Sequence, residues 1–457
     1  MKVEKDKIIS SKERISVKKK VASAKEPKIK DEFLPATSDT KEWTVLAYLM
    51  PNHLEKLRQL EKVGSDNKVN IVAYIPLATG EGYFARRYYV NKAKEASYIA
   101  SSPSDVVAEG PAEDFGSTKT LEDFLEWGIK KYPAKHYLVI MQNHGDIWLG
   151  GWRDEGTGNM LTLPEIDETL KKVENNTGKK IDVLSMDACL MANLENAYEI
   201  KDRADILLAS ENLEYVQLLS GYSGVPLDKT LRGIGKKTPK ELAIQWVEKS
   251  EGDRGSPTQS AIDLKKIEML AKASSNLAKA LLDSSISIDL LRNIVKDSFS
   301  MATSAGITLF SYQKDLASFA KKLLENKDIN DNKVREAAKE VLDSIKEVVI
   351  AEQDNEQEGK ELGGISVYIP TEKEGVEKPW ELFKKDVSPV SDEVPYKELK
   401  FAKDTLWDEF FTKISLPYSL PAPEAPVFFP PADDSIHPPA FPAQIFPFPR
   451  SPNMDIT

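Results

Sequence analysis

The chain alternates near-continuous apolar runs with helical segments, and this alternation constrains its fold more than any other feature. Runs rich in β-forming residues, without polar alternation, are expected to be strands buried on both faces. These runs span 43–50, 69–76, 136–145, 180–187 and 204–211. The segments between them with apolar residues at helical spacing are 54–63, 118–133, 161–173 and 190–200. The pattern predicts an α/β fold with a mostly parallel sheet covered by helices on both faces.

Composition divides the chain into four parts. Residues 1–40 are expected to be a mobile basic arm, because the first 31 residues hold 11 Lys or Arg against 5 Asp or Glu. Residues 41–226 are expected to form the α/β core, and 227–415 a helical region with strands that return to the core sheet. Residues 416–457 contain 12 prolines, which exclude a helix or a central strand, so an extended tail is expected there.

The third part carries the less regular pattern. Short apolar runs at 260–264 and 365–370 predict the two returning strands, and the acidic stretch 351–364 predicts a loop. The last helix is expected over 397–414. Segment 85–90, with two arginines, is typical of an edge strand or a hairpin arm.

Charge and cysteine content limit the classes of function. The 457 residues carry a formal net charge of −11, which argues against nucleic acid as a partner. A single cysteine excludes an intramolecular disulfide, and no apolar run approaches the ~20 residues of a membrane span. The N-terminal stretch lacks the apolar segment of a signal peptide. We therefore expect a cytoplasmic monomer for the sequence as it stands, or secretion if a signal preceded this numbering.

Two reactive side chains lie at the ends of neighbouring apolar runs. His144 ends the run 136–145, and Cys189 follows the run 180–187. A single crossover helix separates the runs, so right-handed β-α-β geometry makes the strands parallel and neighbouring. Ligands of open α/β sheets bind at the carboxyl ends of the strands. The sequence therefore predicts His144 and Cys189 at one sheet edge, roughly 10 Å apart or less given the ~4.8 Å strand spacing.

This placement is typical of nucleophilic catalysis. Cys189 directly precedes the expected helix 190–200, whose dipole would lower the thiol pKa. His144 would protonate the leaving amine, and the backbone N–H groups of Gly145 and Cys189 would form an oxyanion hole. The alternative is structural, because a lone cysteine is often a small buried hydrophobe and a histidine at a strand end is often a packing residue.

The residues around both side chains resemble a known family. "LVIMQNHGDIWLGGW", "SMDACLMANLENAYEI" and "LLASENLE" are similar to the His and Cys motifs of the clostripain-type cysteine peptidases, which belong to the caspase-like clan CD. Further segments over roughly 42–415 follow the family order. The resemblance implies a caspase-like α/β/α sandwich with added C-terminal helices and a His144–Cys189 dyad. It also implies protein or peptide substrates and no organic cofactor.

Metal use rests on the resemblance alone. Some relatives use calcium, so calcium is possible here, but 328–339 has lysines where an EF-hand loop needs its glycine and its last glutamate. An ordinary polar connection between helices explains that segment. The four histidines are scattered along the chain, so no zinc motif is present and no metal site is predicted.

The resemblance also implies cleavage after a basic residue. The family aspartate that precedes the cysteine by two positions matches Asp187, which would bind an Arg or Lys side chain in the pocket for the residue before the cut bond. That residue is called P1, and its pocket S1. Asp187 could instead cap the following helix. Glu211 is the expected second S1 acid, with Glu214 as the nearby alternative, and either residue could instead be a solvated loop charge.

The sequence departs from the family pattern at two loops. The segment after the first strand, "MPNHLEKL", is shortened, and 215–226, "YVQLLSGYSGVP", has no tryptophan. Two alternatives to a peptidase that cleaves after basic residues stay open. One is a non-catalytic interaction protein on a caspase-like scaffold, and the other is a clan peptidase that cleaves after Asn or Asp.

Self-cleavage is the last expectation. Arg153 is the only basic residue of the loop 145–170, and the glycines around it predict a flexible tip, so processing is expected after Arg153. Asp154 and Glu155 follow it directly. In the alternative, Arg153 is a solvated loop charge or pairs with these acids.

Overall fold

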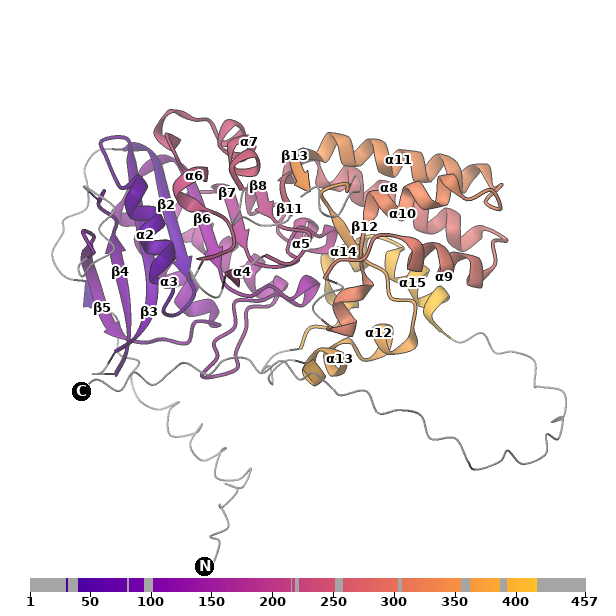
Figure 1. Ribbon diagram of the computed structural model, residues 1–457, viewed down its shortest axis with the longest axis horizontal. Coiled ribbons are helices and arrows are strands. Elements are labelled where there is room, and N and C mark those ends of the chain that lie inside the picture. The colour runs from indigo at the N-terminus through magenta and orange to yellow at the C-terminus, as the bar shows by residue number, and fades with distance from the viewer. Residues whose placement is uncertain are drawn as a thin grey trace, which may run out of the picture. The chain divides into compact units, whose positions relative to one another are not determined.

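A computed structural model gives the structure of the chain (Figure 1). The described residues belong to one compact unit, Met1–Pro417. They are 30–31, 40–79, 82–93, 102–214, 216–217, 222–250, 258–302, 306–354, 362–386 and 393–416. Most of the predicted basic arm and all but one residue of the predicted tail lie outside this set. None of the helices in the described ranges is long and apolar enough to cross a membrane.

A mixed sheet forms the centre of the fold. Its described strands run in the order β1-β5-β4-β3-β2-β6-β7-β8-β11-β13. The five strands from β3 to β8 in this order are parallel, and the remaining pairs are antiparallel. The predicted α/β fold with a largely parallel sheet is therefore confirmed. The strands are β1 (Lys30–Asp31), β2 (Lys41–Leu49), β3 (Val69–Thr79), β4 (Gly82–Tyr89), β5 (Asp105–Pro111), β6 (Ala134–Gln142), β7 (Ile181–Asp187), β8 (Ala204–Ala209), β11 (Thr258–Asp263) and β13 (Val349–Asp354).

Helices bury both faces of this sheet. Along β2, Val45 and Ala47 pack into one hydrophobic cluster, whereas Leu46 and Tyr48 pack into the other, because successive side chains of a strand point to opposite faces. The first cluster is covered by α2 (Leu54–Val63), α6 (Leu227–Thr230) and α7 (Pro239–Ser250). The second is covered by α3 (Thr118–Lys131), α4 (Leu163–Thr177), α5 (Leu194–Glu199) and α8 (Ile267–Asp283).

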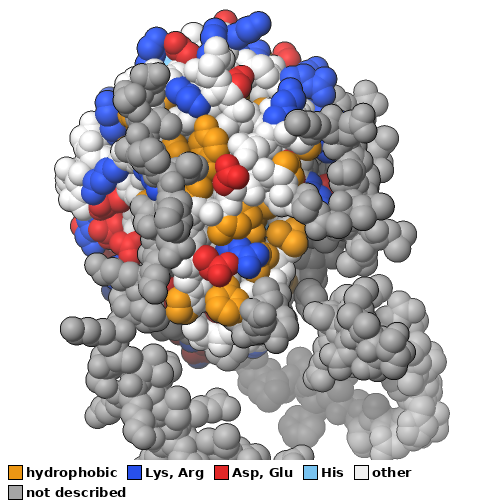
Figure 2. All heavy atoms as spheres, turned by 90° about the vertical axis from the view of Figure 1, so that its left-hand side faces the viewer, with side chains coloured by type: hydrophobic (Ala, Val, Ile, Leu, Met, Phe, Trp, Pro, Cys, Tyr) orange, Lys and Arg blue, Asp and Glu red, His pale blue; other side chains and the backbone are white. Residues whose placement is uncertain are grey.

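The β4–β5 end of the sheet carries charged side chains between exposed apolar ones (Figure 2). Arg86 on β4 pairs with Glu109 on β5, and Val106 on β5 is exposed. Charges on outer strands oppose pairing with another chain. Of the two expectations for 85–90, the hairpin arm is confirmed, because β4 pairs antiparallel with β3, and the edge strand is wrong, because β5 pairs with the other side of β4.

The C-terminal half is mainly helical, and three expectations there need correction. The predicted loop 351–364 begins inside β13, which pairs with β11 at the sheet edge. The run 365–370 does not return to the main sheet, because β14 pairs with β12 in a separate two-stranded sheet and adds one isolated bridge, from Ser366 to Asn193. The single helix expected over 397–414 is divided, because the backbone of Thr405 is extended, with φ −133° and ψ 172°, and the next N–H, that of Leu406, donates to the Ser275 hydroxyl.

The remaining elements in the described ranges are the two short pairs of strands, the helices of the C-terminal half and five 3-10 turns. They are β9 (Val216–Gln217), β10 (Tyr222–Ser223), β12 (Gln313–Asp315), β14 (Ser366–Tyr368), α9 (Ile288–Asp297), α10 (Leu316–Glu325), α11 (Asn332–Val348), α12 (Lys373–Glu377), α13 (Pro379–Asp386), α14 (Lys400–Asp404), α15 (Trp407–Ser415), η1 (Ile147–Leu149), η2 (Ile234–Lys236), η3 (Leu264–Lys266), η5 (Thr308–Tyr312) and η7 (Tyr396–Glu398).

Candidate active site

The register of two neighbouring strands brings the predicted dyad together. β6 and β7 are parallel, and their last registered pair is Gln142 with Asp187. His144 and Cys189 each follow that pair by two residues, so both lie just beyond the carboxyl ends of two adjacent strands. The N–H of Asn143 continues the ladder to the Asp187 carbonyl oxygen at 3.4 Å. The predicted placement of the strands is confirmed, and the catalytic roles of the two side chains stay predictions.

Gly145 allows the two loops to meet at backbone distance. A Cβ atom built on Gly145 would lie 2.2 Å from the Cys189 carbonyl oxygen and 2.9 Å from the Met191 sulfur. Any side chain at this position would push the His144 loop away from the Cys189 loop. The glycine after the histidine is therefore needed for packing, whether or not its N–H binds an oxyanion.

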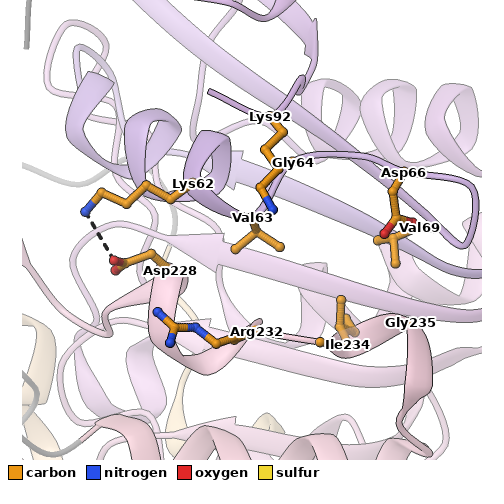
Figure 3. Close-up of a pocket in the computed structure, with 11 residues that line it drawn as sticks. Lys62, Val63, Gly64, Asp66, Val69, Lys92, Asp228, Arg232, Ile234 and Gly235 are labelled. Carbon is orange, nitrogen blue, oxygen red and sulfur yellow. Dashed lines mark hydrogen bonds and ion pairs between the residues drawn. The ribbon is translucent and has the colours of Figure 1, made fainter. Parts of the chain in front are cut away.

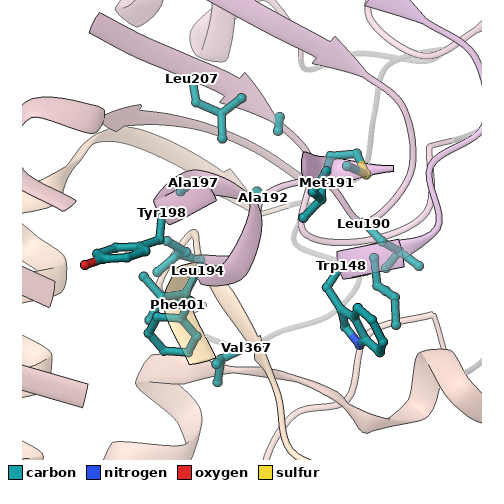
Figure 4. Close-up of a cluster of buried hydrophobic side chains, with 14 of the residues drawn as sticks. Trp148, Leu190, Met191, Ala192, Leu194, Ala197, Tyr198, Leu207, Val367 and Phe401 are labelled. Atoms are coloured by element: carbon teal, nitrogen blue, oxygen red, sulfur yellow. The ribbon is translucent and has the colours of Figure 1, made fainter. Parts of the chain in front are cut away.

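The helix after Cys189 begins later than predicted. It begins at Leu194, with Asn193 as its N-cap, because the Asn193 side chain accepts the Asn196 N–H at 2.8 Å. Leu190 has a φ of 64°, outside the helical region, and its carbonyl accepts the Asn193 side-chain amide at 2.8 Å. The apolar spacing that indicated a helix reflects burial, since Leu190 and its neighbours belong to a hydrophobic cluster with Trp148 (Figure 4).

The environment of Cys189 holds its thiol neutral at rest. The sulfur accepts the N–H of Glu214 at 3.2 Å. Burial of the thiol, and next the carboxyl of Glu214, raise the pKa of Cys189 to about 12, and this N–H offsets them only in part. The helix-dipole argument for a lowered thiol pKa therefore fails, because the turn from Cys189 to Ala192 separates the sulfur from the helix. The side chain of His144 is exposed.

Asp187 lies in a buried ion pair. Lys56 of α2 places its Nζ 2.6 Å from Asp187 Oδ2, and their side chains are 1% and 0% exposed. The other carboxylate oxygen accepts the Val225 N–H at 2.9 Å, and Lys56 also donates to the Val225 carbonyl at 2.7 Å. The carboxylate expected to recognise a basic P1 side chain is thus matched by a cation of the same chain.

Glu214 provides a second acid beside this pair. Its Oε1 accepts the Gln259 side-chain amide at 2.9 Å. A Cβ atom built on Gly224, which has a φ of 62°, would lie 2.2 Å from Asp187 Oδ1 and 2.7 Å from Glu214 Oε2, so both carboxyls border one point. Burial and the charge of Asp187 raise the pKa of Glu214 well above its ordinary value, and Lys56 opposes this shift.

Glu211 interacts with a different partner. Burial, followed by the carboxyl of Asp315, raises the pKa of Glu211 well above its usual range, and the pKa of Asp315 is raised to about 6, mainly by burial. Asp315 caps α10 by accepting the Ser318 N–H at 2.5 Å and also accepts the Gly363 N–H at 2.7 Å. The structure therefore brings Glu214, and not Glu211, beside Asp187.

We expect Glu211→Gln to stabilise the protein at alkaline pH. A carboxyl whose folded pKa is raised contributes stability below its unfolded pKa of about 4.3 and loses it as the pH rises through the folded pKa. The substitution removes this loss, so the variant should gain on the order of 1–3 kcal/mol over the wild type at pH 8. Thermal unfolding at pH 5 and pH 8 measures the difference, and an equal difference at both values would contradict the prediction.

Arg153 is buried in the loop that follows His144. Its guanidinium donates to Asp146 Oδ2 at 3.0 Å, and both side chains are 6% exposed. The guanidinium also lies 5.5 Å from the Phe383 ring centroid. The Trp152 N–H donates to the His144 carbonyl at 3.0 Å, which ties the loop back on itself. The expected flexible tip around Arg153 is wrong, because buried contacts hold the arginine there.

Sequence reasoning missed two residues, Lys56 within α2 and His53 directly before that helix. Lys56 was not assigned, although it shares the buried face of the helix with Leu57 and Leu60, and a lysine on an apolar stripe is a signal. His53 lies before the helix, and its Nδ1 is 3.0 Å from Gln142 Oε1. Burial lowers the pKa of His53. Both residues come from the shortened "MPNHLEKL" segment, so the departure from the family pattern falls at the site itself.

The described residues contain no group of three or more His, Cys, Asp or Glu side chains that could hold a metal ion. In the 328–339 segment, Asp331 instead caps α11 by accepting the Lys333 N–H at 2.9 Å. This cap is the ordinary helix connection that the sequence offered as the alternative to a calcium loop.

Comparison with known proteins places the chain in a family. The model of the clostripain family of C11 peptidases matches residues 49–416. Clostripain of Hathewaya histolytica is 23% identical over 356 residues, and the match covers 64% of this chain and 64% of the length of clostripain. The chain therefore spans under two thirds of that relative.

Two crystal structures of C11 proteases share the fold. One is an inactive zymogen from Parabacteroides distasonis, with a TM-score of 0.55, 17% identity, and coverage of 81% of this chain and 99% of the other. The second is a secreted C11 cysteine protease from Bacteroides thetaiotaomicron in complex with an irreversible peptide inhibitor, with a TM-score of 0.55, 18% identity, and coverage of 80% and 99%. The family model spans the sheet strands from β3 onward in the sequence, both motifs and the C-terminal helices, so the chain belongs to the clostripain family of C11 cysteine peptidases.

Proposed function

We propose that this chain is a cysteine endopeptidase that cleaves peptide bonds after Arg or Lys, with Cys189 as nucleophile and His144 as acid and base. The observation that carries the proposal is the register of β6 and β7, which gives both residues the same offset on adjacent parallel strands. A nucleophile and a base from neighbouring strand ends suit acyl transfer.

The reaction begins with proton transfer from the Cys189 thiol to His144, because burial disfavours a free thiolate. The sulfur attacks the substrate carbonyl carbon and forms a tetrahedral oxyanion, which the N–H groups of Gly145 and Cys189 would stabilise. His144 then protonates the leaving amine as the C–N bond breaks and a thioester remains. Water attacks the thioester, gives its proton to His144, and releases the acid product and the thiol.

The test compares variants on a fluorogenic peptide with Arg at P1. Cys189→Ala is expected to lose all measurable turnover, since the proposed mechanism needs the Cys189 sulfur to form the thioester. Iodoacetamide should label Cys189 in the wild type faster than in His144→Ala protein, because the histidine takes the thiol proton. Turnover that survives Cys189→Ala would eliminate the dyad.

We propose that self-processing after Arg153 follows opening of its loop and is slow in the native protein. The buried pair with Asp146 opposes that opening. Asp146→Asn is expected to speed the cut by about tenfold or more, because local opening then breaks no ion pair. Arg153→Ala should abolish it. Intact mass over time reports the site, and a cut that persists in Cys189→Ala protein would contradict the proposal.

A further inference from the structure

Asp187 cannot act as an unpaired carboxylate in this protein. In a pocket that binds a basic P1 side chain, the buried anion normally has no cationic partner until the substrate cation binds to it. Here Lys56 donates to Asp187 at 2.6 Å, and both side chains are fully enclosed. The Val225 N–H binds the remaining carboxylate oxygen at 2.9 Å. A second cation at Asp187 alone would leave one uncompensated positive charge in a buried site, which is costly.

Glu214 supplies the missing negative charge. Its carboxyl borders the same point beside Gly224 as the Asp187 carboxylate. Asp187 disfavours ionisation of Glu214, and Lys56 favours it. The amide of Gln259 donates to Glu214 and leaves its other oxygen directed towards Asp187. An arriving guanidinium would shift this balance, because a nearby cation favours the ionised form of an acid.

We propose that Lys56 sets the P1 selectivity of this enzyme by neutralising Asp187, so that a basic P1 side chain is bound only when Glu214 gives up its proton. We call Lys56, Asp187 and Glu214 together the floor of the proposed S1 pocket. In the free protein the floor holds Lys56 as a cation, Asp187 as an anion and Glu214 as a neutral acid. In the complex it holds two cations, Lys56 and the substrate side chain, and two anions, and the proton of Glu214 passes to solvent. The inference rests on the proposed peptidase function, because it concerns the S1 pocket of that reaction.

Other charged groups near the floor are few among the described residues. His53 precedes Lys56 in the chain, and its imidazole is held by Gln142 at 3.0 Å. The Cys189 sulfur accepts the Glu214 N–H at 3.2 Å. Burial holds His53 and Cys189 in their neutral forms. Lys56, Asp187 and Glu214 are therefore the groups whose charges a P1 side chain meets.

The test measures binding rather than turnover, so it is separate from the test of the dyad. Full-length Cys189→Ala protein is titrated with two labelled peptides that differ only in P1, which is arginine in one and its neutral isostere citrulline in the other. We expect tighter binding of the arginine peptide, with an affinity that rises with pH, and a pH-independent affinity for citrulline. Calorimetry at pH 7 in buffers of different ionisation enthalpy should show about one proton released with arginine and none with citrulline.

Two substitutions in this background separate the roles. Glu214→Gln is expected to weaken arginine binding by about 10–100-fold, to spare citrulline binding, and to abolish the proton release. Lys56→Met frees Asp187, so arginine should bind more tightly than in the parent protein and without proton release. Lys62→Met is the matched control, because Lys62 lies in the same helix and pairs with Asp228 at the surface at 3.1 Å (Figure 3).

The outcomes are decisive in either direction. An arginine preference that survives Glu214→Gln, or arginine binding without proton release in the parent protein, would overturn the proposal, as would equal affinity for both peptides. If Lys56→Met does not fold, Glu214→Gln decides alone, since it keeps the pair of Lys56 with Asp187 intact. Failure of the dyad would show as turnover by Cys189→Ala protein, and these binding measurements are independent of that result.

Discussion

His144→Ala is expected to lower kcat/KM by about 10³-fold or more at pH 7 and to change the shape of the pH profile. With a thiol pKa of about 12, the thiolate fraction at pH 7 without a base is on the order of 10⁻⁵. In the proposed mechanism His144 removes this limit in the wild type, because it takes the thiol proton in the reaction itself. The variant has no such base, so its activity should rise about tenfold per pH unit between pH 7 and pH 10 as the thiolate forms.

The matched control is His136→Ala. His136 lies at the start of the same strand, where its Nδ1 is 2.8 Å from Asp182 Oδ1, at the opposite end of the sheet from Cys189. Its loss should leave kcat/KM and the pH profile close to the wild type. Rates over pH 6–10 for the three proteins provide the measurement. A flat profile for His144→Ala, parallel to that of the wild type, would show that another group accepts the thiol proton.

The sheet and the edge that carries the dyad were predictable because their signals are local. Each buried strand is a continuous apolar run. A crossover helix between two such runs makes the two strands parallel and places them next to each other in the sheet. β6 and β7 followed this rule, so His144 and Cys189 were expected together. The start of α5 was not predictable in the same way. Leu190 and Met191 are buried by tertiary packing, and burial of a turn imitates the apolar stripe of a helix.

A buried Lys56 had a local signal in the sequence, but the partner of each charge at the site had none. Lys56 and Asp187 are separated by 131 positions, and nothing near either residue indicates the other. The same holds for Arg153, whose partner is Asp146 rather than the adjacent acids, because the loop folds back on its own backbone. The choice between Glu211 and Glu214 depended on which way each side chain leaves the segment after β8, and only tertiary contacts decide that.

Asp187→Ala is expected to destabilise the protein by about 3–5 kcal/mol, because the ammonium of Lys56 would stay buried without its counter-ion. Replacing both residues, with Lys56→Met added to Asp187→Ala, should restore much of the loss, since an apolar side chain of similar length leaves no buried charge. Urea denaturation of the wild type, both single variants and the double variant gives the coupling between the two residues.

Asp228→Ala provides the comparison for this cycle. It removes the partner of Lys62 in the same helix, but that pair lies at the surface, where water screens the charges and the expected cost is about 0–1 kcal/mol. A loss for Asp187→Ala no larger than that for Asp228→Ala would mean that the Lys56 pair contributes nothing to stability. A large loss that the double variant restores would mean that reduced activity in Asp187 single variants reports the fold as well as the S1 pocket. Specificity should then be tested at Glu214, where the ion pair of Lys56 with Asp187 stays intact.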